Sequence, residues 1–103
     1  MMNRDHFDMA AIAPVCRQWR ISELAIFGSA VRNELRPDSD VDVLVTFEEG
    51  AEPTLFDMSR LSRELAEALG REVDLLTRRG VEESRNPYRR REILESAETL
   101  YAA

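Results

Sequence analysis

Residues 27–45 constrain the fold of this chain most strongly, because a glycine turn after one predicted strand is followed closely by two aspartates at the start of the next. An apolar run ends at Phe27-Gly28, and a second run, rich in β-branched residues, begins at Val41. Such residues favour strands, whereas glycine, proline and aspartate favour turns. The pattern predicts a strand over 21–27, a short helix over 29–35, a polar loop over 36–39 and a strand over 41–47.

Asp40 and Asp42 open the second of these strands two positions apart. Side chains alternate across a strand, so both carboxylates are expected on one face, with Val41 and Val43 on the other. Carboxylates that share one patch of space repel each other unless a cation or a hydrogen-bonding partner compensates them. Because Mg²⁺ typically takes one or two protein carboxylates together with water and substrate phosphate, the pair predicts a magnesium site.

Gly28 and Ser29 stand at the start of the short predicted helix. Free backbone N–H groups and the positive end of a helix favour an anion there, and glycine lets a phosphate approach the backbone closely. Arg32 lies one turn further on and is a second phosphate-binding candidate. Metal ligands on one side and a phosphate cradle on the other predict a nucleoside triphosphate site.

Asp74 is a carboxylate in the otherwise apolar strand predicted over 71–77. Taken alone, it is equally compatible with an edge-strand residue that faces water. With Asp40 and Asp42 it would give three carboxylates from two strands, enough for the two metal ions that clamp the attacking and leaving oxygens in phosphoryl transfer. Asp74 would also be placed to help draw the proton from the attacking hydroxyl.

Helical and strand patterns alternate along the rest of the chain. Helices are expected over 5–19, with a kink at Pro14, over 54–69, and after Asn86-Pro87; residues 78–85 are expected to be a polar connection and 99–101 a short strand. This order predicts a single α+β domain over residues 1–103, with a small mixed sheet of about four strands and helices mainly on one face.

The overall charge and composition limit the class of partner. The net charge of −6 argues against a general nucleic-acid binder, which would carry a basic groove. No apolar run reaches the length of a membrane span, and no signal-peptide segment opens the chain. The single cysteine, Cys16, fits a reducing compartment. We therefore expect a cytoplasmic protein that binds neither membranes nor nucleic acids directly.

Six arginines form the main basic concentration of this acidic chain. One interpretation is a solvated face that balances the glutamates. The other is a binding surface for an acidic partner or for the triphosphate, since arginine forks suit both. The sequence leaves the two open for Arg78, Arg79, Arg85, Arg89, Arg90 and Arg91.

The Gly28-Ser29 pair, followed after ten residues by Asp40-Val41-Asp42, resembles the signature of the minimal nucleotidyltransferases (MNT type), a branch of the DNA polymerase β-like superfamily. Residues 37–39 and 73–76 also match, so the resemblance covers nearly the whole chain. It implies the polymerase β-like minimal nucleotidyltransferase fold and a Mg²⁺-dependent reaction with ATP as substrate. The residues it assigns are Asp40, Asp42 and Asp74 as metal-binding catalytic carboxylates, and Gly28, Ser29, Arg32 and Ser39 as nucleotide-binding residues.

The resemblance also implies a partner protein. Such short proteins are similar to antitoxins paired with HEPN-domain ribonuclease toxins, in which the transferase moves AMP from ATP to a tyrosine of the toxin. The chain length agrees, because larger nucleotidyltransferases add a second domain for the base or the acceptor and 103 residues leave no room for one. We therefore expect a hetero-oligomer with a HEPN-domain protein.

Three other functions compete with this one. A nucleotidyltransferase acting on a small molecule is disfavoured by the absent second domain. A binding module that neutralises its partner by covering it is disfavoured by the intact carboxylates. A template-directed polymerase is the weakest alternative, given the negative charge. The sequence does not fix the base preference, the acceptor residue or the stoichiometry.

Overall fold

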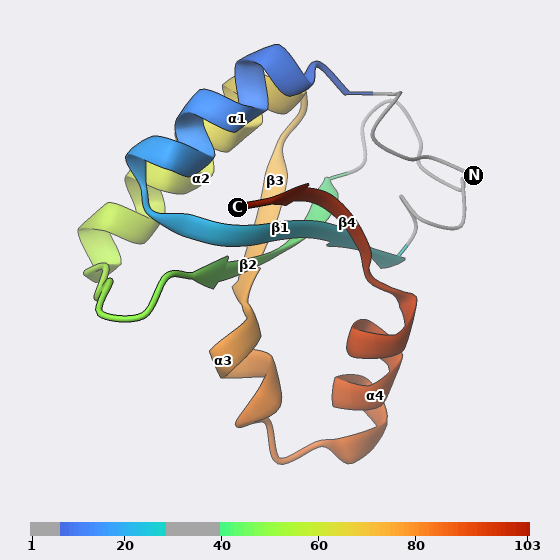
Figure 1. The fold of residues 1–103 in the computed structure, drawn as a ribbon. Helices are drawn as coiled ribbons and strands as arrows, with labels where there is room; N and C mark the ends of the chain where they lie inside the picture. The colour runs from blue at the N-terminus through green and yellow to red at the C-terminus, as the bar shows by residue number, and fades with distance from the viewer. Residues whose placement is uncertain (1–6, 29–39) are drawn as a thin grey trace.

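The computed structural model describes residues 7–28 and 40–103, which form a mixture of helices and strands (Figure 1). In chain order the described elements are α1 (Met9–Gln18), β1 (Ile21–Phe27), β2 (Val41–Phe47), α2 (Leu55–Leu69), β3 (Val73–Thr77), α3 (Arg78–Glu82), α4 (Pro87–Ser96) and β4 (Glu98–Ala102).

The four described strands form one mixed sheet in the order β3-β2-β1-β4. β1 runs antiparallel to both β2 and β4, whereas β2 and β3 are parallel and are connected through α2. Parallel strands need such a crossover, and α2 supplies it. The predicted small mixed sheet is therefore confirmed, and β3 and β4 are its edges.

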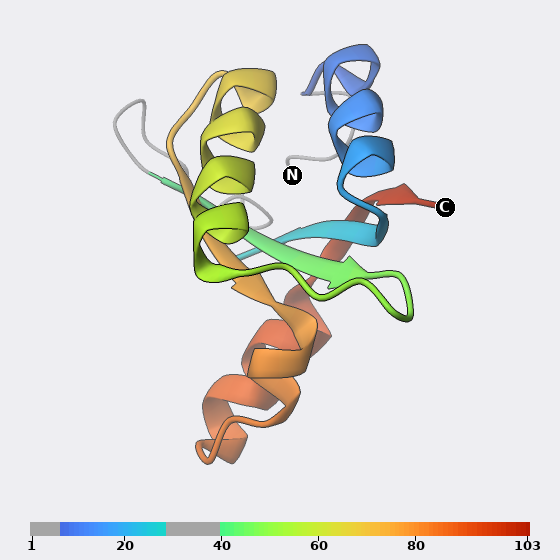
Figure 2. The ribbon, with the colours of Figure 1, turned by 90° about the vertical axis from the view of Figure 1, so that its left-hand side faces the viewer.

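One face of the sheet carries the larger part of the core. Alternate residues of the central strands, including Leu24, Ile26 and Val43, pack there against buried residues of α1 and α2, such as Ile12 and Leu65. The two helices lie side by side over this face (Figure 2). The Trp19 indole N–H donates to Oε1 of Glu64 at 3.1 Å and ties the end of α1 to α2.

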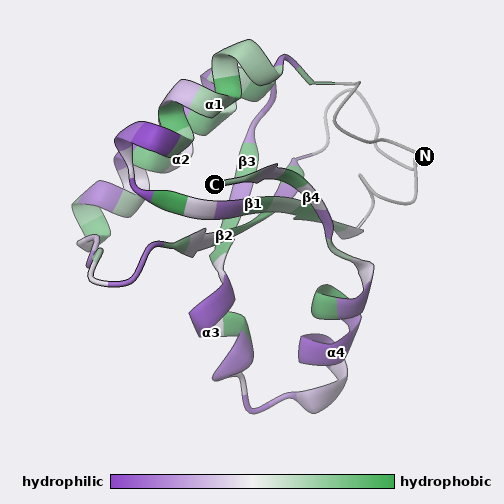
Figure 3. Cartoon of the chain, viewed as in Figure 1, coloured by the Kyte–Doolittle hydropathy of each residue, from purple (hydrophilic) through white to green (hydrophobic). Residues whose placement is uncertain are grey.

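The other face carries the shorter helical layer of α3 and α4 (Figure 2). Ala25, Phe27 and Leu44 form a smaller cluster there with Val81 of α3 and Ile93 of α4. This second layer leaves little trace in the sequence, because both helices are mostly hydrophilic (Figure 3). A single buried residue in each suffices to dock them against the sheet.

Local signals explain where the helices begin and end. In α2, the Thr54 hydroxyl accepts from the Asp57 N–H and the Asp57 carboxylate accepts from the Thr54 N–H, and Gly70 ends the helix with φ 74°. Asn86 caps α4 in the predicted position, with its side chain accepting from two backbone N–H groups. The helix does not restart near Pro14, since α1 continues as one helix through this exposed residue.

Cys16 is completely buried in the larger core cluster. Burial raises the pKa of its thiol to about 11, against a smaller opposing effect of the neighbouring Arg17. The thiol therefore stays neutral near pH 7 and fills space in the core. Among residues 7–28 and 40–103, no helix combines the length and apolar character needed to cross a membrane.

Candidate active site

Two of the predicted carboxylates lie opposite each other on neighbouring parallel strands. Asp42 of β2 is the register partner of Asp74 of β3. Neighbouring strands run roughly 4.8 Å apart, so residues in register are direct neighbours. Both side chains belong to the face covered by α3 and α4, because Leu44 and Leu76, two positions further along each strand, pack into the cluster on that face. Asp42 is half-buried and Asp74 is exposed.

Gly28 brings the backbone directly against the Asp42 carboxylate. It follows β1 with φ 69°, a left-handed conformation that glycine adopts without strain. A Cβ at this position would lie 2.6 Å from Oδ2 of Asp42, so a side chain here would displace that carboxylate. The corner predicted from the sequence is thus a place where a glycine makes room for a carboxylate.

Asp40, the third predicted carboxylate, stands one residue before β2 and is exposed. The following Val41 N–H donates to the Glu72 carbonyl at 2.9 Å and fixes the entry to the strand beside β3. Within the described ranges, no three His, Cys, Asp or Glu side chains form a group that could hold a metal ion. The register therefore places Asp42 beside Asp74, and the three predicted carboxylates do not form one group that could hold a metal ion.

Three of the predicted nucleotide-binding residues fall outside the part of the chain that the structure describes. Ser29, Arg32 and Ser39 lie outside the described residues, as do the helix predicted over 29–35 and the loop predicted over 36–39. Their roles in nucleotide binding stay predictions.

A cavity of about 270 Å³ opens beside the Asp42 carboxylate. One wall comes from Phe27, Gly28 and Asp42 at the ends of the central strands, and the other from Arg89, Glu92, Ile93 and Ser96 of α4. Glu92 and Ser96 were not predicted as site residues. Their signal was the spacing of positions 89, 92, 93 and 96, which places all four on one helix face, but only the docking of α4 shows what that face meets.

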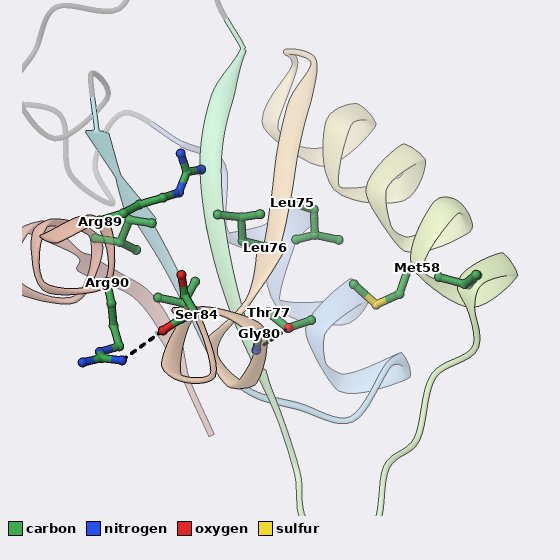
Figure 4. A pocket seen from close by; sticks show the side chains of 11 residues that line it. Met58, Leu75, Leu76, Thr77, Gly80, Ser84, Arg89 and Arg90 are labelled. Carbon is green, nitrogen blue, oxygen red and sulfur yellow. Dashed lines mark hydrogen bonds between the residues drawn. The ribbon is translucent and has the colours of Figure 1, made fainter. Parts of the chain in front are cut away.

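A second, larger cavity of about 440 Å³ lies along the edge strand β3, between α2, α3 and α4 (Figure 4). It is mostly apolar, lined by Met58, Leu75, Leu76 and Val81 among others, with Arg89 at the boundary shared with the first cavity. Leu55, at the start of α2, also lines it and is 88% exposed. An apolar groove therefore adjoins the acidic site.

The arginine segment, residues 78–91, contains six arginines, and within the described residues four of them bond to another residue through their side chains. Arg78 makes the closest ion pair, 2.9 Å from Nη2 to Oε1 of Glu23, and also bonds to the Thr46 hydroxyl. Arg79 and Arg91 each meet a glutamate one turn later, and Arg90 donates to a backbone carbonyl. Within the described residues, the side chains of Arg85 and Arg89 make no such bond.

Comparison with known proteins points to one family. Residues 10–100 match the model of the family described as a nucleotidyltransferase domain. A candidate protein adenylyltransferase of Methanocaldococcus jannaschii is 47% identical over 66 residues, which cover 64% of this chain and 69% of the relative.

Solved structures share the fold across most of the chain. A candidate minimal nucleotidyltransferase is 35% identical, with a TM-score of 0.68, over 94% of this chain and 95% of the other. A complex of a tri-AMPylated Shewanella oneidensis HEPN toxin with an MNT antitoxin contains a chain that is 20% identical, with a TM-score of 0.59. That match covers 89% of this chain and 67% of the other, and at this identity it shows the fold alone.

Proposed function

We propose that this chain, which belongs to the nucleotidyltransferase domain family, is an antitoxin that moves AMP from ATP to a tyrosine of a HEPN-domain toxin. Family membership and the four-stranded mixed sheet confirm the minimal nucleotidyltransferase resemblance recognised in the sequence. The name of the relative from Methanocaldococcus jannaschii supports AMP transfer to a protein, and the complex of an AMPylated HEPN toxin supports a HEPN-domain protein as the one modified.

The observation that carries the proposal is the pairing of Asp42 with Asp74 against the Gly28 corner. Oxygen donors of this kind fit Mg²⁺, which needs only one or two protein carboxylates. Asp42 and Asp74 would hold the ion; Asp40, exposed at the entry to β2, is the third carboxylate of the predicted set. When bound, Mg²⁺ supplies positive charge that stabilises the phosphates during transfer.

The chain's own residues then divide the work of the transfer. The acceptor oxygen bonds to the α-phosphorus of ATP while the bond from that phosphorus to pyrophosphate breaks. Asp74, exposed beside Asp42, takes the proton that the acceptor hydroxyl loses. Gly28 leaves the backbone open to the triphosphate, and Ser29, Arg32 and Ser39 complete the nucleotide-binding set.

The test is a transfer reaction with a purified HEPN-domain protein. We expect this protein to gain the mass of one or more AMP groups when it is incubated with the chain, ATP and Mg²⁺. Tandem mass spectrometry should locate them on tyrosine, and chelation of Mg²⁺ should prevent the gain. An unchanged partner mass after complete reaction conditions would contradict the proposal.

Neutralisation by covering alone is the competing function. Leu55 and Phe56 at the start of α2 are 88% and 89% exposed, and large exposed apolar side chains favour a contact surface. Such a surface serves an enzyme that docks its protein substrate equally well, so it does not separate the two functions.

Gly28→Ala is expected to reduce AMP transfer about a hundredfold, because the new Cβ would displace the Asp42 carboxylate. The substitution also costs roughly 1 kcal/mol of stability, since φ is 69°. Transfer rates and thermal midpoints measure the two effects.

Gly70→Ala is the matched control for this variant. Gly70 has φ 74°, and a Cβ at this position would meet no atom within 4 Å, so the control carries the backbone strain without the clash. It should lose similar stability and keep its transfer rate. Equal transfer by the two variants would contradict the role given to the Gly28 corner.

A further inference from the structure

We propose that Arg89 is a substrate-binding residue whose guanidinium contacts the phosphates of the bound nucleotide from the wall of the cavity opposite Gly28. The inference rests on the proposed nucleotide transfer and assigns to it a residue outside the family motif recognised in the sequence. For Arg89, it also favours the interpretation as a binding residue over the interpretation as part of a solvated face.

The first support is the position of Arg89. The cavity beside Asp42 has Gly28 on one wall and Arg89 on the other, so a ligand that reaches the Asp42 carboxylate lies within the space that Arg89 also borders. In Figure 4 the Arg89 side chain runs from α4 toward the strands, whereas Arg90 turns to the Ser84 carbonyl, to which it donates at 3.1 Å.

The second support is that the Arg89 backbone is held while its side chain is available. The Arg89 N–H donates to Oδ1 of Asn86 at 3.1 Å, which fixes its place in the first turn of α4. In the described part of the chain, its guanidinium makes no hydrogen bond or ion pair, although Arg79 and Arg91 each meet a glutamate one turn away. Arg89 therefore gives up no internal bond when it binds an anion.

The third support is charge. A triphosphate carries several negative charges, and the cavity wall opposite Arg89 carries the Asp42 carboxylate. An arginine fork opposite this wall offers paired hydrogen bonds to phosphate oxygens and offsets part of the repulsion. Glu92 borders the same cavity one turn along α4, so the phosphates are expected at the Arg89 end and away from Glu92.

The experiment measures binding of ATP in the presence of Mg²⁺ to the full chain, without a partner protein, by calorimetry. Arg89→Ala should raise the Kd roughly tenfold or more, because charged hydrogen bonds are lost. Arg89→Lys keeps the charge without the fork and should fall between Arg89→Ala and the wild type. Adenosine, which has no phosphate, should bind the wild type and Arg89→Ala equally.

Arg85→Ala is the matched control, since Arg85 belongs to the same segment, is exposed and has no side-chain bond within the described residues. It should bind ATP as the wild type does. Equal Kd values for Arg89→Ala and Arg85→Ala would overturn the inference while the proposed function stands. Failure of the wild type to bind ATP would instead overturn the proposed function, and the inference with it.

Discussion

Asp42→Asn and Asp74→Asn are each expected to lower AMP transfer by orders of magnitude while the protein stays folded. The amide is nearly the same size as the carboxylate but lacks the charge that would hold Mg²⁺. Since the amide keeps the size of the carboxylate and neither side chain belongs to the core clusters, the thermal midpoint should stay near that of the wild type. Transfer to the partner and thermal unfolding, measured on the same preparations, test both parts.

Glu67→Gln is the matched control for the two asparagine variants. Glu67 is exposed on α2, whose packed side lies on the opposite face of the sheet, and its replacement removes the same unit of charge. It should transfer AMP at the wild-type rate. Normal transfer by either asparagine variant would show that the carboxylate concerned is not part of the reacting site. A lowered thermal midpoint would show instead that the carboxylate supports the fold.

The elements predicted correctly are those with strong local signals. The run of β-branched residues set the bounds of β2, and the Thr54–Asp57 capping pair and Gly70 set those of α2. The helix α3 was missed because only Val81 in it is buried, so its sequence shows no apolar stripe. Arg78, which looked like part of a polar connection, is held by an ion pair to Glu23, a partner distant in the sequence.

From the sequence, only those features of the site could be predicted that depend on a single strand. Alternation along β2 and β3 correctly indicated the faces of Asp42 and Asp74. Asp42 and Asp74 are direct neighbours because of the register between the parallel strands β2 and β3. The crossover through α2 sets this register, and no short sequence motif encodes it. The contribution of Arg89 and Glu92 depends in the same way on how α4 docks, through the single buried side chain of Ile93.

Protection of cells from the partner toxin is expected to need only substoichiometric amounts of this chain. An enzyme modifies many partner molecules in turn, and a toxin carrying AMP should stay inactive after the antitoxin has been removed. Neutralisation by covering instead requires one antitoxin for each binding site and ends when the complex dissociates. Titrating the antitoxin against a fixed amount of toxin, then separating the two proteins and assaying the toxin, distinguishes these outcomes.

The Asp40→Asn/Asp42→Asn double variant, produced at the wild-type level, decides between catalysis and covering. Asp42 lies on the sheet face away from α1 and α2, and Asp40 stands just before β2, so the exposed Leu55 and Phe56 stay available for contact with the partner. We expect the variant to bind the toxin, to leave it without AMP and to fail to protect cells. Full protection by this variant, with no AMP on the toxin, would show that covering is sufficient, because the partner would then be silenced without any change to its covalent structure.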